Sequence, residues 1–305
     1  MSRESPDAPR VVAIGGGHGL AMTLRALRSY AGDITAVVSV ADDGGSTGRL
    51  RRDLGVLGVG DLRKCLVALA SREPDGTGGE WAAAFEHRFG AGDLEGHALG
   101  NLVLIGLAEV TGDYERALAL AGRALGTVGR VLPATSEPVV LTAEVDGGEV
   151  VGQVAVQNSL ARIRRVALRP PDARSPDSVA AAIRAAHQVV LAPGSLFTSL
   201  LPTLCVPAVR QALIATEAPI VQVANLHATE PETKGLTAID HLQAVLEAGV
   251  PVAHFVVATT SRLPVDDAAI AGLGTDLVRA DIARPDVMAH APAKLAPVLA
   301  SLLES

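Results

Sequence analysis

The sequence predicts an α/β protein with a doubly wound, Rossmann-like and mostly parallel sheet. Of its 305 residues 49% are apolar and 2% aromatic, so Ala, Val, Leu and Ile must build the core, as in parallel strands covered on both faces. Short apolar runs alternate with segments of helical spacing along most of the chain. The length allows one large domain with small accessory segments, and we predict a single α/β domain over residues 1–305.

The first part of the chain predicts one βαβ unit. Residues 11–14 form an apolar run that ends in glycines, and leucines at helical spacing follow it. Residues 34–40 form a second apolar run, rich in β-branched side chains, and residues 41–46 after it have the composition of a turn or loop. The chain therefore begins with a strand, a glycine-rich loop, a helix and a second strand.

Two segments then interrupt the alternation. A helical segment without strands is predicted, with helices at residues 62–70, 81–89, 99–110 and 114–125. Short strand-like runs follow at residues 139–145, 150–156 and 163–168, and Gly147 and Gly148 are typical of a hairpin turn. We therefore expect a small antiparallel β appendage at about residues 131–168.

The α/β alternation resumes in the last part of the chain. Strands are predicted at residues 189–192, 220–224, 252–257 and 277–282. Helices are predicted at residues 178–186, 204–215, 239–248 and 293–303. This pattern returns the chain to the same parallel sheet.

Charge and composition exclude several classes of partner. The net charge is −7 and no basic run stands out, so nucleic acid is not expected to bind. The first ten residues lack the apolar stretch of a secretory signal, and no segment has the length of a membrane span, so we expect a cytoplasmic protein. Cys65 and Cys205 show no metal-binding spacing and are expected to be reduced, buried thiols. We also expect a homodimer.

Four loops follow predicted strands and carry the candidate functional residues. They are residues 15–19, 42–46, 193–199 and 225–229. In an open parallel sheet such loops gather at one edge, and ligands bind where the strand order reverses. The sequence therefore predicts one pocket formed by all four loops.

The first loop contains Gly16, Gly17, His18 and Gly19 between a strand and a helix. Backbone amides at such a helix start can bind a phosphate, whereas the alternative is a tight turn without a ligand. The loop lacks the third glycine of a dinucleotide fingerprint and the Lys-Ser/Thr of a P-loop.

Carboxylates follow the second strand and begin a later helix. Asp42 and Asp43, with Ser46 beside them, follow the glycine loop by about the number of residues at which an acid commonly contacts a ribose hydroxyl. They can also hold a divalent cation against phosphates. The alternative is an Asp-Gly turn whose acids are solvated. Asp61 either caps its helix or contacts a metal or ligand. Asp42, Asp43 and Asp61 are therefore candidates to contact a divalent cation, with Mg²⁺ and a nucleotide as the expected combination.

The last two loops offer polar groups to a ligand. Gly194 and Ser195 can contact a second phosphate or a sugar, although Ser195 can equally be a helix-capping serine, and no partner base for a nucleophile can be nominated. Asn225 can read a base edge or a sugar hydroxyl, or begin a turn. Phe197 stacks on a base or belongs to the core.

Several motifs together resemble the YvcK-like gluconeogenesis factor family within the CofD superfamily. The chain carries them in order over nearly its whole length: GGGHGL (residues 15–20), ADDGGSTGRL (41–50), GDLR (60–63), HRF (87–89), GHALGNL (96–102), GRVLPAT (129–135), PGSLFTS (193–199) and NL (225–226).

The resemblance implies a Rossmann-like protein that binds a UDP-sugar such as UDP-N-acetylglucosamine and supports cell shape and wall synthesis during gluconeogenic growth. The CofD branch implies instead a transferase that moves a phospholactyl group onto a deazaflavin, with a divalent metal held by acids at positions matched by Asp42 and Asp61. The chain departs from the family pattern at His18, where a threonine is usual, and at Ala289, where an arginine is usual. Gly58 and Val59 replace the usual prolines.

Three functions are therefore open. The first is a nucleotide-sugar binder without turnover, and the second is a CofD-like, metal-dependent 2-phospho-L-lactate transferase. The transferase function is disfavoured because the chain has few aromatic side chains that could stack on a deazaflavin. A nicotinamide-dependent oxidoreductase is the third, and the incomplete glycine fingerprint disfavours it.

Overall fold

The protein folds around a seven-stranded sheet in which every neighbouring pair of strands is parallel. The structure, a computed structural model, describes residues 8–71, 77–228, 230–286 and 289–303. The strand order is β10-β9-β8-β7-β1-β2-β3. The strands are β1 (Arg10–Gly15), β2 (Asp33–Val38), β3 (Arg130–Pro133), β7 (Gln188–Leu191), β8 (Ile220–Val223), β9 (His254–Ala258) and β10 (Asp276–Ala280). This confirms the predicted doubly wound α/β fold.

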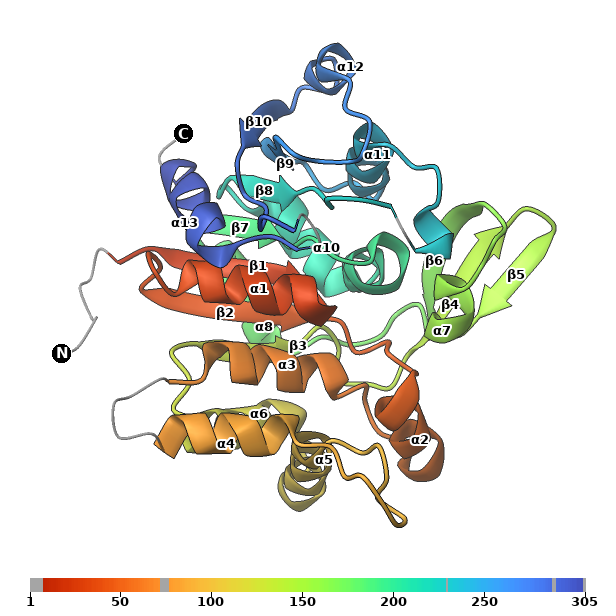
Figure 1. Ribbon diagram of the computed structural model, residues 1–305. Coiled ribbons are helices and arrows are strands. Elements are labelled where there is room, and N and C mark those ends of the chain that lie inside the picture. Colours follow the sequence, from red (N-terminus) through yellow and green to blue (C-terminus); the bar gives the residue numbers. More distant parts are fainter. Residues whose placement is uncertain (1–7, 72–76, 229, 287–288, 304–305) are drawn as a thin grey trace.

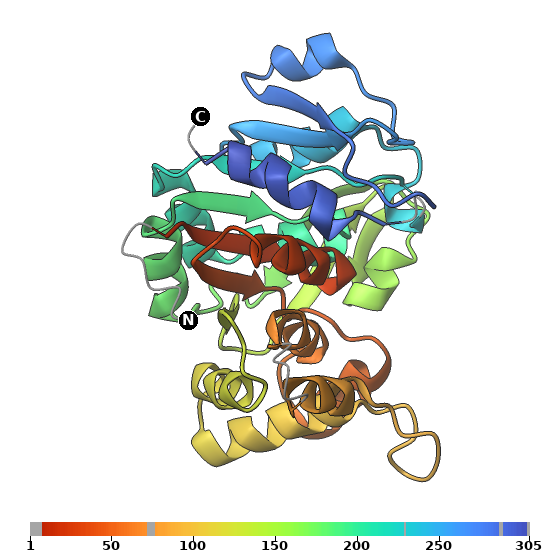
Figure 2. The same ribbon diagram turned by 60° about the vertical axis from the view of Figure 1, so that its left-hand side comes forward.

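Helices cover both faces of this sheet (Figures 1 and 2). On one face lie α1 (Gly17–Leu27), α3 (Gly60–Leu69) and α13 (Pro292–Ser301). On the other lie α8 (Asp177–Arg184), α10 (Pro207–Ala215) and α11 (Ala238–Glu247). The central strands β1, β7, β8 and β9 are buried along almost their whole length, as expected of apolar strands sandwiched between helices.

A helical segment follows β2, as the sequence predicts. It contains α4 (Thr77–Glu86), α5 (Leu99–Thr111) and α6 (Tyr114–Ala124), and it lies beside α3 in Figure 1. The structure adds α2 (Gly45–Leu54), where we predicted a turn or loop that included Ser46. The polar sequence of α2 has no apolar stripe to reveal it, and the Arg51 guanidinium anchors it by donating to the carbonyls of Asp42 and Val139.

The antiparallel appendage is confirmed as a three-stranded sheet in the order β5-β4-β6. Its strands are β4 (Val140–Val145), β5 (Gly148–Val151) and β6 (Ile163–Arg169). β3, which we expected to belong to this segment, instead pairs parallel with β2 at the edge of the main sheet. The predicted strand at residues 150–156 ends at Val151, and α7 (Gln153–Gln157) replaces the rest of it.

Short elements complete the chain. They are η1 (Leu196–Leu200, a π-helix), α9 (Leu201–Leu204), η2 (Pro231–Thr233, a 3₁₀-helix) and α12 (Asp267–Ala271). Among the described residues no single helix has the length and apolarity to cross a membrane; Leu196–Leu204 and Pro207–Ala215 reach that composition together but are bent by 75°.

Candidate functional site

The sheet topology creates a crevice between β1 and β7. From β1 the chain moves outward through β2 and β3, whereas β7 to β10 extend in the opposite direction, so the strand order reverses between β1 and β7. A cavity of about 530 Å³ lies at the carboxyl ends of these strands. Ligands of open α/β sheets bind at this position. The predicted residues that line it are Gly16, Gly17, His18, Gly19, Asp42, Asp61, Gly194, Ser195 and Asn225.

The glycine loop leads into α1 and packs directly against the loop that follows β7. Gly17 has φ +63°, a conformation that favours glycine. A Cβ on Gly19 would lie 1.6 Å from the carbonyl oxygen of Pro193, so only glycine allows this close approach of the two loops. The sequence therefore specifies glycines here for backbone conformation and packing as well as for any ligand.

Asp61 caps α1 and not the start of its own helix. Its Oδ2 accepts the Gly17 amide at 2.7 Å, and its Oδ1 accepts from Lys64 Nζ at 3.0 Å. Asp61 is 7% exposed and Lys64 lines the cavity beside it. A carboxylate thus occupies part of the amino-terminal end of α1, and an ammonium group compensates its charge.

His18 and Asp42 are partly desolvated at the same end of the cavity. Burial, together with the nearby ammonium of Lys64, lowers the pKa of His18. Burial, with a further contribution from the charge of Asp61, raises the pKa of Asp42. Asp42 Oδ1 accepts the Gly44 amide at 3.0 Å, the local turn that was the alternative to a ligand contact.

The carboxylates fit a divalent cation only in part. Among the described ranges no group of three or more His, Cys, Asp or Glu side chains is arranged to hold a metal. Asp42 and Asp61 both line the cavity. Mg²⁺ is commonly held by one or two carboxylates, with waters and substrate phosphates supplying the remaining ligands. These two residues match that role and would need a phosphate ligand to complete it.

Asp43 does not line the cavity. Its carboxylate accepts the amides of Gln153 at 2.8 Å and Val154 at 2.9 Å, and so caps α7 from a distant part of the chain. Gly152, with φ +101°, turns the chain into this contact. Asp43 therefore attaches the appendage to the end of β2, and Gln153 and Gln157 of α7 become part of the cavity lining.

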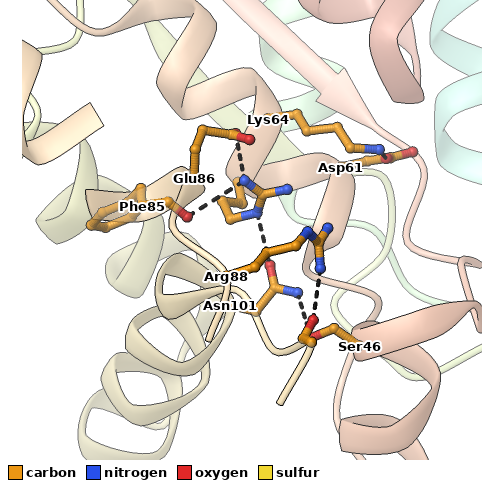
Figure 3. Close-up of polar contacts among 9 residues, drawn as sticks. Ser46, Asp61, Lys64, Phe85, Glu86, Arg88 and Asn101 are labelled. Carbon is orange, nitrogen blue, oxygen red and sulfur yellow. Dashed lines mark hydrogen bonds and ion pairs between the residues drawn. The ribbon is translucent and has the colours of Figure 1, made fainter. Parts of the chain in front are cut away.

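Ser46 also lies outside the cavity lining, in a buried polar network (Figure 3). Its hydroxyl accepts from Asn101 Nδ2 at 3.2 Å and contacts His97 Nδ1 at 3.0 Å. Asn101 Oδ1 accepts from Arg63 Nε at 3.1 Å, and Arg63, 2% exposed, forms an ion pair with Glu86. The network joins α2, α4 and α5 to α3, the helix that carries Asp61 and Lys64.

The oxygen and the nitrogen of the Asn225 side-chain amide both hydrogen-bond to the loop that follows β7. Its Oδ1 accepts the Gly194 amide at 2.9 Å and its Nδ2 donates to the Gly194 carbonyl at 2.8 Å. Both groups proposed for reading a base or sugar are therefore already paired. Thr229, the last residue of this predicted loop, lies outside the described residues, and Phe197 is 8% exposed and belongs to the core.

Ser195 has a carboxylate partner that the sequence did not reveal. Its hydroxyl donates to Glu232 Oε1 and accepts from Thr198 Oγ1 at 2.6 Å. Burial raises the pKa of Glu232 to about 7. Glu232 lies seven residues beyond Asn225, and two acids flanking Pro231 after a strand were the available signal.

Two further lining residues were not predicted as ligand contacts. Lys64 is one helical turn beyond Asp61, and its spacing from that acid was the signal for a cation at the same site. His290 lines the cavity from the segment before α13. Burial lowers the pKa of His290 to about 4, so its imidazole is neutral at physiological pH.

Known proteins resemble this chain in sequence and in structure. A protein of Mycobacterium leprae is 43% identical over 97% of this chain and 86% of its own length. The gluconeogenesis factor of Bacillus subtilis is 41% identical over 78% of this chain and 74% of its own length. A crystal structure of a UPF0052 family member from Bacillus halodurans superimposes with a TM-score of 0.90 at 35% identity, covering 96% of this chain and 99% of that one.

A family model completes the assignment. The model described as 2-phospho-L-lactate transferase CofD matches residues 11–288. This range contains the main sheet, the helical segment and the appendage, and it covers every residue of the cavity lining except Ala289 and His290. The chain therefore belongs to the CofD family, and its relatives include gluconeogenesis factors.

Proposed function

We propose that this protein binds a UDP-sugar, such as UDP-N-acetylglucosamine, in the cavity between β1 and β7, without turning it over. The observation that carries the proposal is the position of one large cavity at the reversal of strand order, next to the glycine-rich start of α1. As a relative of gluconeogenesis factors, it would support cell shape and cell-wall metabolism during gluconeogenic growth.

The end of the cavity at α1 suits a diphosphate. Amides of the first helical turn have no partner within the helix, and Asp61 takes only that of Gly17. The amides of His18 and Gly19 are thus the donors offered to an anion. Lys64 supplies a positive charge beside them, and its ion pair with Asp61 can open to accept a phosphate.

The size of the cavity also agrees with a ligand of this class. Pockets for ligands the size of a drug or cofactor are commonly about 300–1,000 Å³. At about 530 Å³ this cavity accommodates a compact ligand of that class. Its lining is drawn from α1, α3, α7 and the loops after β2, β7 and β8, so a bound nucleotide would touch distant parts of the chain.

Calorimetric titration with UDP-N-acetylglucosamine and UDP, each with and without Mg²⁺, tests the proposal. We expect saturable binding of both, and Lys64→Ala should weaken both by about tenfold, the loss of one charge-assisted contact. Arg123→Ala removes an exposed charge outside the cavity and should have no effect. Absence of heat with every uridine nucleotide would overturn this ligand class.

A second candidate function is a CofD-like transfer of a 2-phospho-L-lactyl group to a deazaflavin acceptor. The family match and the two cavity carboxylates, Asp42 and Asp61, favour it. Asp42 and Asp61 would hold the divalent cation, which would neutralise phosphate charge. This function would be established if the wild type forms product only with a divalent metal and Asp42→Asn forms none. It would be excluded if the wild type forms no product when Mg²⁺ is supplied.

A further inference from the structure

The wall of the cavity formed after β8 carries a buried carboxylate oxygen without a partner. Glu232 is 5% exposed and lines the cavity from η2. Ser195 donates to its Oε1, whereas its Oε2 has no hydrogen-bond partner in the part of the chain that the structure describes. An unpaired buried acceptor is unfavourable, so a bound ligand that donates to it would gain free energy.

His290 adds a second acceptor near the end of β8. It is 6% exposed and hydrogen-bonds to the backbone of Ala224, while its Nε2 has no partner within the described ranges. A bond to a carbonyl requires Nδ1 to carry the proton. In the neutral ring Nε2 then presents a lone pair and can only accept.

Two parts of the cavity lining therefore differ in chemistry. The start of α1 offers amide donors and the Lys64 ammonium, which offsets the charge of Asp61, with Asp42 also in the lining. Among the lining residues after β7 and β8, by contrast, Ser195 is already bonded to the Glu232 carboxylate, and the segment before α13 adds His290; Glu232 Oε2 and His290 Nε2 are unpaired acceptors. A phosphate beside Ser195 would meet the Glu232 carboxylate, and like charges at such distances repel. The loop after β7, which we predicted to contact either a second phosphate or a sugar, thus suits an uncharged group.

We infer that Glu232 and His290 form a subsite that recognises hydroxyl or amide N–H donors of the ligand's sugar. This inference rests on the proposed binding of a UDP-sugar, and it gives that ligand a direction. The diphosphate lies at the amino-terminal end of α1, and the sugar lies against the loops after β7 and β8. The subsite accepts a neutral, donor-rich group and disfavours a second phosphate.

Two conservative variants test the subsite. Glu232→Gln keeps an acceptor for Ser195 but replaces the unpaired acceptor with an NH₂ donor. His290→Asn keeps the donor to Ala224 and removes the Nε2 acceptor. Titration near pH 8 compares UDP with UDP-N-acetylglucosamine, because Glu232 is then ionised. Both variants should bind UDP-N-acetylglucosamine about tenfold more weakly and bind UDP as the wild type does.

Glu109→Gln, which removes an exposed acid outside the cavity, is the matched control and should change neither affinity. Thermal unfolding of each variant checks that it is folded. If Glu232→Gln and His290→Asn change UDP and UDP-N-acetylglucosamine alike, or change neither, the subsite is refuted and the proposed function stands. A folded wild type that binds neither probe overturns both.

Discussion

Asn225 and Gly194 exchange two hydrogen bonds across neighbouring strand ends, with lengths of 2.9 and 2.8 Å. The side chain after β8 thereby fixes the backbone after β7, the segment that leads to Ser195. Gly194 has φ +152°, so this backbone has a conformation that other residues rarely adopt. The side-chain amide of Asn225, at the end of the next strand, thus helps to position the loop that carries Ser195.

Replacing that amide should loosen the loop. Asn225→Ala leaves two backbone groups of Gly194 without partners, and we expect the free energy of unfolding to fall by about 2 kcal/mol. Asn158→Ala, which removes one exposed bond to the Val154 carbonyl, should cost about 0.5 kcal/mol or less. Urea unfolding measures the free energy of unfolding of both variants. Equal decreases would show that the two hydrogen bonds with Gly194 contribute no more to stability than one exposed hydrogen bond.

Burial of Glu232 makes stability fall as pH rises. Its pKa is raised from 4.5 to about 7, so the folded protein holds this proton more tightly than the unfolded chain. The contribution is fully present below pH 4.5 and is lost as pH rises to about 7, a decline of about 3 kcal/mol. Glu232→Gln should abolish this decline in urea unfolding across the same range. A variant with the wild-type slope contradicts the assignment to Glu232.

His290 should have the opposite effect. Its pKa is lowered from 6.5 to about 4, so its contribution is present above pH 6.5 and is lost as pH falls to about 4. We expect His290→Asn to be less sensitive to acid than the wild type over this interval, by about 3 kcal/mol. Between pH 4.5 and 6.5 the two slopes oppose each other in the wild type, so only the single variants reveal them.

Two glycine substitutions separate close packing from helix propensity. Gly19→Ala places a Cβ 1.6 Å from the Pro193 carbonyl oxygen, and we expect a loss of more than about 3 kcal/mol because backbone must move. Gly106→Ala, within α5 and with no atom within 4 Å of the added Cβ, should stabilise by about 0.5–1 kcal/mol. Differential scanning calorimetry would show opposite shifts in Tm, and a tolerated Gly19→Ala would contradict the packing of the two loops.

The strands and their loops could be predicted because buried parallel strands leave strong apolar runs. The runs that became β1, β7 and β8 ended near Gly16, Gly194 and Asn225, and these loops line one cavity. β3 was assigned to the wrong sheet, since a strand of four residues with three apolar side chains does not specify whether its partner is parallel or antiparallel.

The missed site residues depend on tertiary contacts that have no local pattern. Glu232 acquires its role from Ser195, 37 residues away, and Asp43 is engaged by α7 amides 110 residues later. Asp61 was predicted to cap its own helix or to contact a metal or ligand, but it caps α1, whose first turn lies 44 residues earlier in the chain. Residue type indicated which side chains are polar, whereas the partner of each side chain required the fold.

The contact between Asp43 and α7 makes the appendage a wall of the cavity. Since Gln153 and Gln157 reach the cavity only while α7 is docked, a ligand that touches them would bind the docked arrangement more tightly than a detached one. Filling the cavity should then slow amide hydrogen exchange in β4 and β6, strands that themselves contribute no residue to its lining.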